Sequence, residues 1–427
     1  MDTRFKETKI GRIPQEWTFA KLSEVVELRH GYQFRDYDFT KSGIAVVKIG
    51  NLIDGNLYLN DATFIDANRL SDFDNYVVRN GDLLMSLTGN IGRVVEVKGL
   101  ETPVLQNYRV GRFSPRGNKM IKRYLKYALS SELLTKQINK FANQTAQANF
   151  GKKDLDKLSL FYPVPLPEQR KIAEILSTVD EAIEKTDAII NKTRQLKKGL
   201  MQKLFTEGIG HTRFKETRIG RIPEEWEIKP LGELGDFFKG TSIGANEIVE
   251  KGIPCIRYGD IYVEYENDSY VTRFSAFISE DTAKHSRKIE TGDILFAGTG
   301  ETQEDIGKCV AYTRGEEAYA GGDLIVFRPR KEYQLNSLFL AYCLNCGDVR
   351  KAKIRLGQGL SIFHIYSKHL KIVDVPIPLV SEQNKITEIL SELDTKIETE
   401  QAFKSELEQL KKGLMQVLLT GKVRVKV

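Results

Sequence analysis

Hydrophobic residues follow a seven-residue repeat in two long stretches of the chain, and elsewhere they form short segments broken by glycine and aspartate. The first repeat consists of Ile172, Leu176, Val179, Ile183, Ile190, Leu200 and Leu204. The second consists of Ile386, Leu390, Leu393, Ile397, Leu407, Leu414 and Leu418. Polar residues interrupt both repeats at matching places, namely Thr186, Thr193 and Lys197 in one, and Glu400, Lys404 and Lys411 in the other. A repeat of this period is typical of coiled-coil helices, in which polar positions fix the register.

Both stretches begin with residues that suit the start of a helix. Prolines precede Glu168 and Gln169 in the first, and Ser381 precedes Glu382 and Gln383 in the second. Each predicted helix has about 35 to 40 residues, or roughly 55 Å of length at the helical rise. Since neither has a partner in its own half of the chain, we predict that they pair antiparallel. The alternative is that each helix lies on its own globular domain.

The order of segments is repeated along the chain. Thr3–Trp17 returns as Thr212–Trp226 with 13 of 15 residues identical. Shorter matches follow in the same order, pairing Gly43–Gly50 with Gly252–Gly259, Gly81–Asp82 with Gly292–Asp293, and Leu196–Phe205 with Leu410–Leu419. A repeat of this length indicates two copies of one structural unit.

Each copy changes once from short β-rich segments to one long helical pattern, which predicts an α+β fold with a pseudo-two-fold internal repeat. We therefore expect a β-rich domain at 1–165, a long helix at 166–207, a second β-rich domain at 208–378 and a second long helix at 379–427. Gly208, Gly210 and His211 between the copies are expected to form a flexible joint.

Composition excludes several classes of protein. With 41% hydrophobic and 29% charged residues, the 427-residue chain is typical of globular proteins. The start lacks the apolar segment of a secretion signal, and no stretch is apolar enough to span a membrane, so we expect a cytoplasmic protein. Four cysteines, all in the second half, are too few for a disulfide framework. The Cys343-x-x-Cys346 pair has no second pair to complete a zinc site, and we interpret it as core packing.

Signatures of catalysis are weak. Asp82, Glu96 and Lys98 have the residue types of a metal-dependent nuclease site, but the second copy keeps only the aspartate, with Ala311 and Thr313 in place of the other two. We interpret the shared Gly-Asp as a turn before a buried strand. No phosphate-binding loop and no metal-binding histidine pattern occurs. We predict no catalytic residue, no cofactor and no metal site.

Positive charge is clustered although the net charge is only +6. Residues 102–131 contain seven basic residues and no acidic one, which are Arg109, Arg112, Arg116, Lys119, Lys122, Arg123 and Lys126. Residues 349–373 also lack acidic residues and contain Arg350, Lys351, Lys353, Arg355, Lys368 and Lys371. Such clusters predict a basic surface on each domain that contacts DNA phosphates, unless they are only solvated helix faces.

Polar loops of the two copies occupy matching places and differ in sequence. Arginine, asparagine and glutamine are the side chains best suited to reading base edges. The predicted DNA-binding residues of the first copy are Arg29, Tyr32, Gln33, Arg35, Asn90, Arg93, Gln147 and Asn149. Those of the second copy are Lys239, Thr241, Ser242, Gln303, Gln358 and Ser361. Matching positions with different loop sequences predict that the two copies bind two different DNA sequences.

The chain resembles the specificity subunit of type I restriction-modification systems over essentially its full length. The motifs that carry the resemblance are Ile-Gly-x-Ile-Pro-x-Glu-Trp at 10–17 and 219–226, Gly-Asp-[Leu/Ile]-Leu at 81 and 292, and the Glu-Gln-led helix starts at 165–172 and 376–386. The resemblance implies two target recognition domains joined by two long antiparallel helices. It implies a non-catalytic subunit that reads a bipartite, asymmetric site in double-stranded DNA.

The same resemblance implies partners for this chain. These are two modification (methyltransferase) subunits and the restriction (motor-nuclease) subunits, with no membrane partner. Two alternatives stay open at this point. One is the related specificity subunit of a type IIB restriction enzyme, and the other is a coiled-coil scaffold that binds proteins and not DNA.

Overall fold

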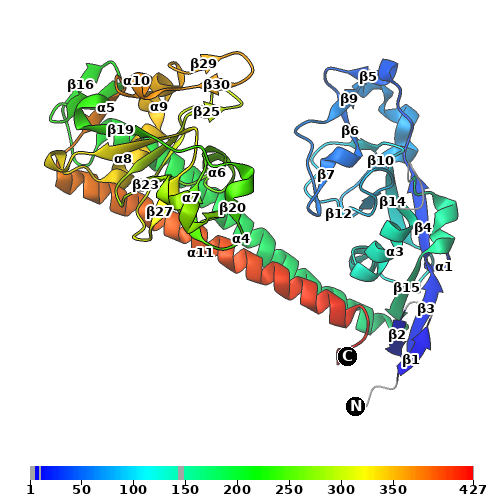
Figure 1. Ribbon diagram of the computed structural model, residues 1–427. Helices are drawn as coiled ribbons and strands as arrows, with labels where there is room; N and C mark the ends of the chain where they lie inside the picture. The colour runs from blue at the N-terminus through cyan, green and yellow to red at the C-terminus, as the bar shows by residue number, and fades with distance from the viewer. Residues whose placement is uncertain (1–4, 9–10, 143–148, 427) are drawn as a thin grey trace. The chain divides into compact units, whose positions relative to one another are not determined.

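The computed structural model describes residues 5–8, 11–142 and 149–426 of the chain. The chain forms two compact units, each of which contains one globular domain and a part of both long helices (Figure 1). Unit 1 comprises Met1–Thr186 together with Phe403–Val427, and unit 2 comprises Asp187–Ala402. The division of the chain into four segments by sequence stays a prediction.

Two sheets form the globular domain of unit 1. The four-stranded sheet has the order β12 (Val94–Glu96), β11 (Leu83–Ser86), β14 (Val110–Pro115) and β4 (Val26–His30). The five-stranded sheet has the order β10 (Val77–Val78), β13 (Val104–Gln106), β6 (Ile44–Val47), β9 (Thr63–Ile65) and β5 (Phe39–Thr40). All pairs are antiparallel except β13 with β6. Strands β6 and β11 consist entirely of buried residues, so they lie at the centre of the fold.

Smaller elements complete this domain. Two-stranded pairs join β1 (Phe5–Thr8) to β2 (Gly11–Pro14), β3 (Trp17–Lys21) to β15 (Ser159–Pro163), and β7 (Leu52–Ile53) to β8 (Asn56–Leu57). The helices are α1 (Leu22–Val25), α2 (Lys122–Leu129) and α3 (Glu132–Ala142), with 3-10 turns η1 (Asp36–Asp38), η2 (Ile49–Asn51), η3 (Ala67–Tyr76) and η4 (Lys152–Lys157).

Unit 2 repeats both large sheets in the same strand order. Its four-stranded sheet is β26 (Cys309–Ala311), β24 (Ile294–Ala297), β28 (Leu324–Pro329) and β19 (Gly235–Lys239). Its five-stranded sheet is β23 (Arg287–Ile289), β27 (Ala318–Ala320), β21 (Ile253–Ile256), β22 (Ala276–Ile278) and β20 (Ile248–Val249), with the same single parallel pair, β27 with β21. The internal repeat predicted from the sequence is therefore confirmed in the sheet topology.

Two further strand pairs of unit 2 also follow the first copy, and a three-stranded sheet is additional. The paired strands are β16 (Phe214–Thr217) with β17 (Gly220–Pro223), β18 (Glu227–Pro230) with β31 (Asp374–Ile377), and the sheet of β25 (Thr299–Gly300), β30 (Phe363–His364) and β29 (Gln358–Gly359). The helices are α5 (Leu231–Leu234), α6 (Tyr258–Val263), α7 (Glu280–Lys284), α8 (Ser337–Leu344), α9 (Gly347–Ile354) and α10 (Ser367–Leu370), with 3-10 turns η5 (Ala245–Glu247) and η6 (Lys331–Tyr333).

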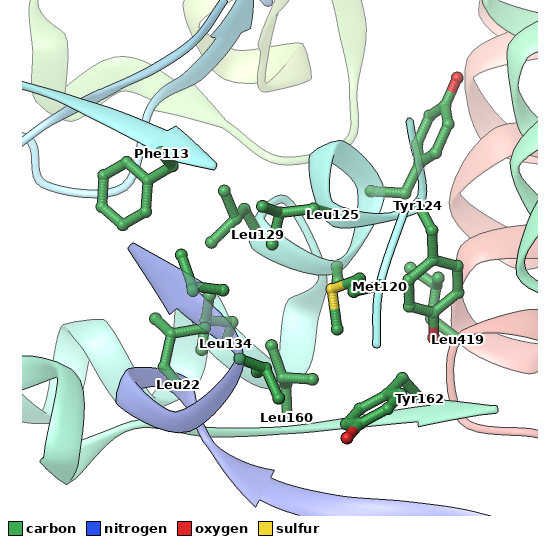
Figure 2. Close-up of a cluster of buried hydrophobic side chains, with 14 of the residues drawn as sticks. Leu22, Phe113, Met120, Tyr124, Leu125, Leu129, Leu134, Leu160, Tyr162 and Leu419 are labelled. Atoms are coloured by element: carbon green, nitrogen blue, oxygen red, sulfur yellow. The ribbon is translucent and has the colours of Figure 1, made fainter. Parts of the chain in front are cut away.

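The two long helices are α4 (Leu166–Glu207) and α11 (Val380–Leu418). In unit 1, Ile172 and Leu176 near the start of α4 share a core with Leu418 at the end of α11 and with Leu419. Figure 2 shows Leu419 beside Met120 and Tyr124 of the globular domain. In unit 2, Leu204 at the end of α4 shares a core with residues near the start of α11. The predicted antiparallel pairing is thus confirmed in each unit.

Polar residues in the helix seam are ion-paired, and the arrangement is repeated. In unit 2, Lys197 of α4 forms a buried ion pair with Asp394 of α11, and the hydroxyl of Tyr342 donates to the same carboxylate at 2.5 Å. In unit 1 the roles are exchanged, because Lys411 of α11 pairs with Asp180 of α4 at 2.6 Å and Tyr127 donates to it at 2.7 Å. Each cluster joins both long helices to a helix of the globular domain.

Charge balance keeps the Asp180 carboxylate ionised. Burial by itself raises the pKa of Asp180, but the hydrogen bond from Lys411 and the charge of Lys126, 3.0 Å away, outweigh it, so that the net shift of the pKa is downward.

The Glu-Gln pair at the start of each long helix forms hydrogen bonds with the globular domain of the same unit. The buried side chain of Gln169 accepts from the backbone N–H of Ile121 at 2.9 Å and donates to two carbonyls at 2.8 Å. Gln383 likewise accepts from the N–H of Asn336 at 2.9 Å. Both tryptophan indoles donate to the neighbouring glutamates, Trp17 to Glu168 and Trp226 to Glu382. The repeated tryptophan motif is therefore a structural contact between the domain and the helix.

A third contact at each glutamate comes from the residues that follow a long helix. In unit 1, Arg424 donates to Glu168 at 2.6 Å and to Glu16 at 2.9 Å. In unit 2, His211 contacts Glu382 at 3.0 Å and Glu225 at 2.9 Å. His211 in unit 2 therefore occupies the place of Arg424 in unit 1, and each side chain contacts two glutamates.

The predicted flexible joint at Gly208–His211 is wrong. A Cβ at Gly208 would lie within 3 Å of Trp226, Glu382 and His211, and the N–H of Ile209 donates to Glu382 at 2.8 Å. Gly208 also has a φ of +63°, which favours glycine. Gly208 is closely packed, Gly210 supplies a left-handed backbone conformation, and Ile209 between them packs against the core of unit 2.

The histidine clamp makes the stability of unit 2 depend on pH. Burial by itself lowers the pKa of His211, but the two glutamates outweigh it and the net shift is upward from the ordinary value of 6.5. A raised pKa adds stability that is present in full below pH 6.5 and is lost as the pH rises through the folded-state pKa. We therefore expect the free energy of unfolding of unit 2, followed by Trp226 fluorescence in urea in a Trp17→Phe background, to fall as the pH rises from about 6.5 through the folded-state pKa of His211.

His211→Arg is the matched variant for this prediction, because Arg424 occupies the corresponding place in unit 1. An arginine stays charged over this pH range, so the variant should not show the fall. Equal pH dependence in both proteins would contradict the prediction.

No helix in the described part of the chain is long and apolar enough to cross a membrane.

Candidate nucleic-acid interface

Two predicted loops of unit 1 and a third segment, the turn before β14, meet at one edge of the four-stranded sheet. The register pairs His30 with Gly111 and Ser86 with Val110, so the ends of β4 and β11 lie beside the start of β14. Loops that leave an antiparallel sheet at the same end emerge on the same side. The loops after β4 and β11 and the turn before β14 therefore form one surface.

Backbone hydrogen bonds tie these loops together. The N–H of Tyr32 donates to Gln106 at 2.9 Å, and the N–H of Leu87 donates to Arg109 at 2.9 Å. Phe150 donates to Leu87 at 2.8 Å, and Asn149 forms a bridge with Thr88. Asn149 thus lies at the same edge, whereas Gln147 lies outside the described residues.

The predicted side chains at this edge are exposed, and several are already positioned. Exposed side chains include Arg29, Gln33, Arg35, Asn90, Arg93 and Asn149. Arg29 forms an ion pair with Glu27 at 3.0 Å, which holds its guanidinium at the sheet edge. The ring of Tyr32 packs edge-on against Phe34 and Phe73 with centroids about 5 Å apart and stays 37% exposed.

The same edge exists in unit 2. The register pairs Lys239 with Ile325 and Ala297 with Leu324, which places the ends of β19 and β24 beside the start of β28. Thr241 lies in a bridge with Gly321, as Tyr32 does with Asn107 in unit 1. Strand β25 pairs with β30, so the loops that contain Gln303 and Gln358 meet. The predicted residues of this copy that are exposed are Lys239, Ser242, Gln303, Gln358 and Ser361, and Thr241 is half-buried.

Four residues of the predicted basic clusters make contacts within the protein. Arg112 and Lys122 pair with Asp82 at 3.3 and 3.4 Å, and Lys126 pairs with Asp180. In unit 2, Lys353 is 1% exposed, and burial lowers its pKa. The expectation that each whole cluster contacts phosphates is therefore wrong for these residues, because carboxylates and core groups distant in sequence surround them.

The turn before β14 was not among the loops predicted from the sequence, although Arg109 was predicted as part of the basic cluster. Asn107, Tyr108 and Arg109 form the turn before β14, where the Asn107 side chain accepts from the N–H of Arg109 at 3.1 Å. The guanidinium of Arg109 lies 5.3 Å from the centre of the Tyr108 ring and is exposed. The sequence feature that could have identified this turn is the run Asn-Tyr-Arg between two buried strands.

The Gly-Asp motif is structural, as predicted. Asp82 accepts from the N–H of Arg79 at 2.9 Å, and Asp293 accepts from the N–H of Glu290 at 2.8 Å. Arg328 of β28 also donates to Asp293 at 2.8 Å. Each aspartate therefore closes the turn before a buried strand. Among the residues that the structure describes, no group of three acidic, histidine or cysteine side chains is placed to hold a metal ion.

The Cys343-x-x-Cys346 pair lies in the core of unit 2. Burial raises the pKa of Cys343 well above its ordinary value and that of Cys346 to about 11. Protonated thiols are poor metal ligands and nucleophiles, so the pair packs as small apolar groups.

Comparisons with known proteins agree with this architecture. The family model of the type I restriction modification DNA specificity domain matches the chain twice, at residues 14–194 and 223–409. Two specificity subunits from Methanocaldococcus jannaschii, named MjaX and MjaVIII, are 29% and 26% identical over 100% of this chain and 98% and 97% of their own length.

Solved structures share the fold. The type I specificity subunit from M. genitalium gives a TM-score of 0.58 at 18% identity, with 98% of this chain and 99% of that chain covered. The family model covers most of both copies of the repeat. The chain therefore belongs to the family of type I restriction-modification DNA specificity proteins, with one specificity domain in each copy of its internal repeat.

Proposed function

We propose that this chain is the non-catalytic specificity subunit that reads a bipartite, asymmetric site in double-stranded DNA, one half with each globular domain. The observation that carries the proposal is the sheet edge that occurs in both units. The strand register at this edge is the same in the two units, but the polar loops differ in sequence. Relatives named as type I restriction enzyme specificity subunits over their full length support it.

The exposed amide and guanidinium side chains at the sheet edge of each unit are the groups that would hydrogen-bond to the bases. In unit 1 these include Arg29, Arg93 and Asn90, and in unit 2 they include Gln303 and Gln358. Arginine can bind guanine, and asparagine or glutamine can bind adenine, through two hydrogen bonds in the major groove. Because the two sets differ, the two half-sites should differ in sequence.

The partners that we propose are two modification subunits and the restriction subunits of the same system. A related structure describes assembly of a type I restriction-modification complex. On this chain, Leu196 and Leu410 occupy the same place in the repeat and are 54% and 51% exposed. Gly199 and Gly413 beside them have open space around the Cβ position. The internal repeat thus presents the same exposed position twice, which suits two copies of one partner. Such a complex would work in the cytoplasm, where the cell's DNA lies.

Binding to DNA of random sequence separates this proposal from a scaffold that binds only proteins. We expect a mobility shift at low salt, and a loss of affinity of about 10²- to 10³-fold between 50 and 200 mM salt, because released counterions drive phosphate contacts. The control is Asp281→Ala, a change in an exposed ion pair away from the sheet edge. Absence of any shift at low salt, with the chain folded, would contradict the proposal.

A further inference from the structure

Unit 2 carries a leucine at the end of a hairpin on its candidate DNA-reading edge. Leu360, between β29 and β30, is 100% exposed. In Figure 1 the hairpin of β29 and β30 lies at the border of unit 2, and its connecting loop extends away from the helices. A large apolar side chain with no neighbour gains nothing from burial in the free protein.

The hairpin is held in place by the body of the domain. Strand β30 pairs with β25, with His364 opposite Thr299, and the Thr299 hydroxyl lies 3.2 Å from the His364 ring nitrogen. Gly359 has a φ of +154°, and a Cβ there would lie 1.9 Å from the carbonyl oxygen of Ile362. The tight turn therefore requires glycine and presents the next residue, Leu360, outward.

The surroundings of the leucine fit a polyanion. Close to Leu360 in the sequence, Gln358, Ser361 and the apolar Ile362 are exposed, and so are the basic residues Arg355 and Lys368. Within the described part of the chain, neither Arg355 nor Lys368 forms an ion pair. Residues 349–373 contain no acidic residue. An apolar tip with a polar and cationic rim suits a base stack flanked by phosphates.

We infer that Leu360 is a wedge that enters between two base pairs of the second half-site and unstacks them. The inference rests on the proposed function and adds a mode of reading to it. Apolar side chains inserted in this way kink the duplex, so that the choice of base step depends on how easily the step unstacks. Residues 143–149, the matching loop of the first copy, contain no large apolar residue, so the wedge is expected in one half-site only.

The test uses the full chain in complex with its modification subunits and a duplex that carries the site methylated in the host. The adenine analogue 2-aminopurine replaces each adenine on either strand of the second half-site in turn. Binding should raise its fluorescence at one step, because unstacking removes quenching. Leu360→Ala should abolish the rise and weaken binding to this duplex about tenfold, while Leu360→Phe, which keeps a large apolar wedge, should retain both.

Leu379→Ala is the control. Leu379 is another exposed leucine of unit 2, with 79% of its surface accessible, but it lies beside the start of α11 and not in the hairpin. An unchanged fluorescence rise in Leu360→Ala would overturn the wedge. So would a variant that keeps DNA binding and fails to assemble with its subunits, since the leucine would then contact protein. Failure of the unchanged protein to select any duplex would instead contradict the proposed function.

Discussion

Replacing Asp394 with alanine is expected to lower the free energy of unfolding of unit 2 by about 3 to 5 kcal/mol. The Asp394 carboxylate is buried and receives both the Lys197 ammonium and the Tyr342 hydroxyl. Without it, a cation and a hydroxyl stay in the core without their partner, and the cost of desolvating them is no longer offset. The measurement is urea unfolding followed by Trp226 fluorescence in a Trp17→Phe background, where only unit 2 contributes.

Two further variants give this result its meaning. Asp281→Ala removes one partner of the exposed pair with Lys284 and should change stability little, because exposed ion pairs contribute about 0 to 1 kcal/mol. The triple variant Lys197→Met, Asp394→Leu and Tyr342→Phe should recover most of the loss, since apolar groups of similar size often replace a buried pair without cost. A loss of less than about 1 kcal/mol in Asp394→Ala would contradict the assigned role of the pair.

Exchanging residues 18–160 for the matching domain of another specificity subunit is expected to change one half of the methylated site completely. The exchange leaves Trp17, Glu168 and Arg424 in place, so the clamp between the domain and α4 is retained. Gln169 accepts a hydrogen bond from the backbone N–H of Ile121. Because this donor is a backbone group, the exchanged domain can donate the same hydrogen bond. The loops of unit 2 are untouched.

Methylome sequencing of a strain that carries the exchanged chain provides the measurement. The half-site assigned to unit 2 should persist, which serves as the internal control. A change in both halves, or in neither, would show that the domains do not read separately.

The long helices and the repeat were predictable from the sequence because they depend on local periodicity. The predicted seam residues Ile172, Leu176 and Ile190 are buried as the seven-residue pattern requires. Lys197 was recognised only as an interruption of that pattern. Its partner Asp394 lies 197 residues away, and no local signal connects the two.

The errors have the same physical origin. Charge counted along the sequence places Arg112 and Lys126 on a DNA surface, but the fold brings Asp82 and Asp180 to them. Gly208 and Gly210 resemble a flexible linker until Trp226 and Glu382 are placed against Gly208. The candidate loops could be located because they follow buried strands. Their grouping at one edge depends on the register of strands far apart in sequence, and so does the exposure of Leu360.

The most direct test of the account is sequencing of methylated bases in host DNA with this gene intact and with it deleted. The account predicts that deletion removes methylation from one motif, composed of two different short sequences separated by a gap of unspecified bases. Methylation that is unchanged by the deletion, or lost from a single uninterrupted sequence, would contradict two separate readers in one chain.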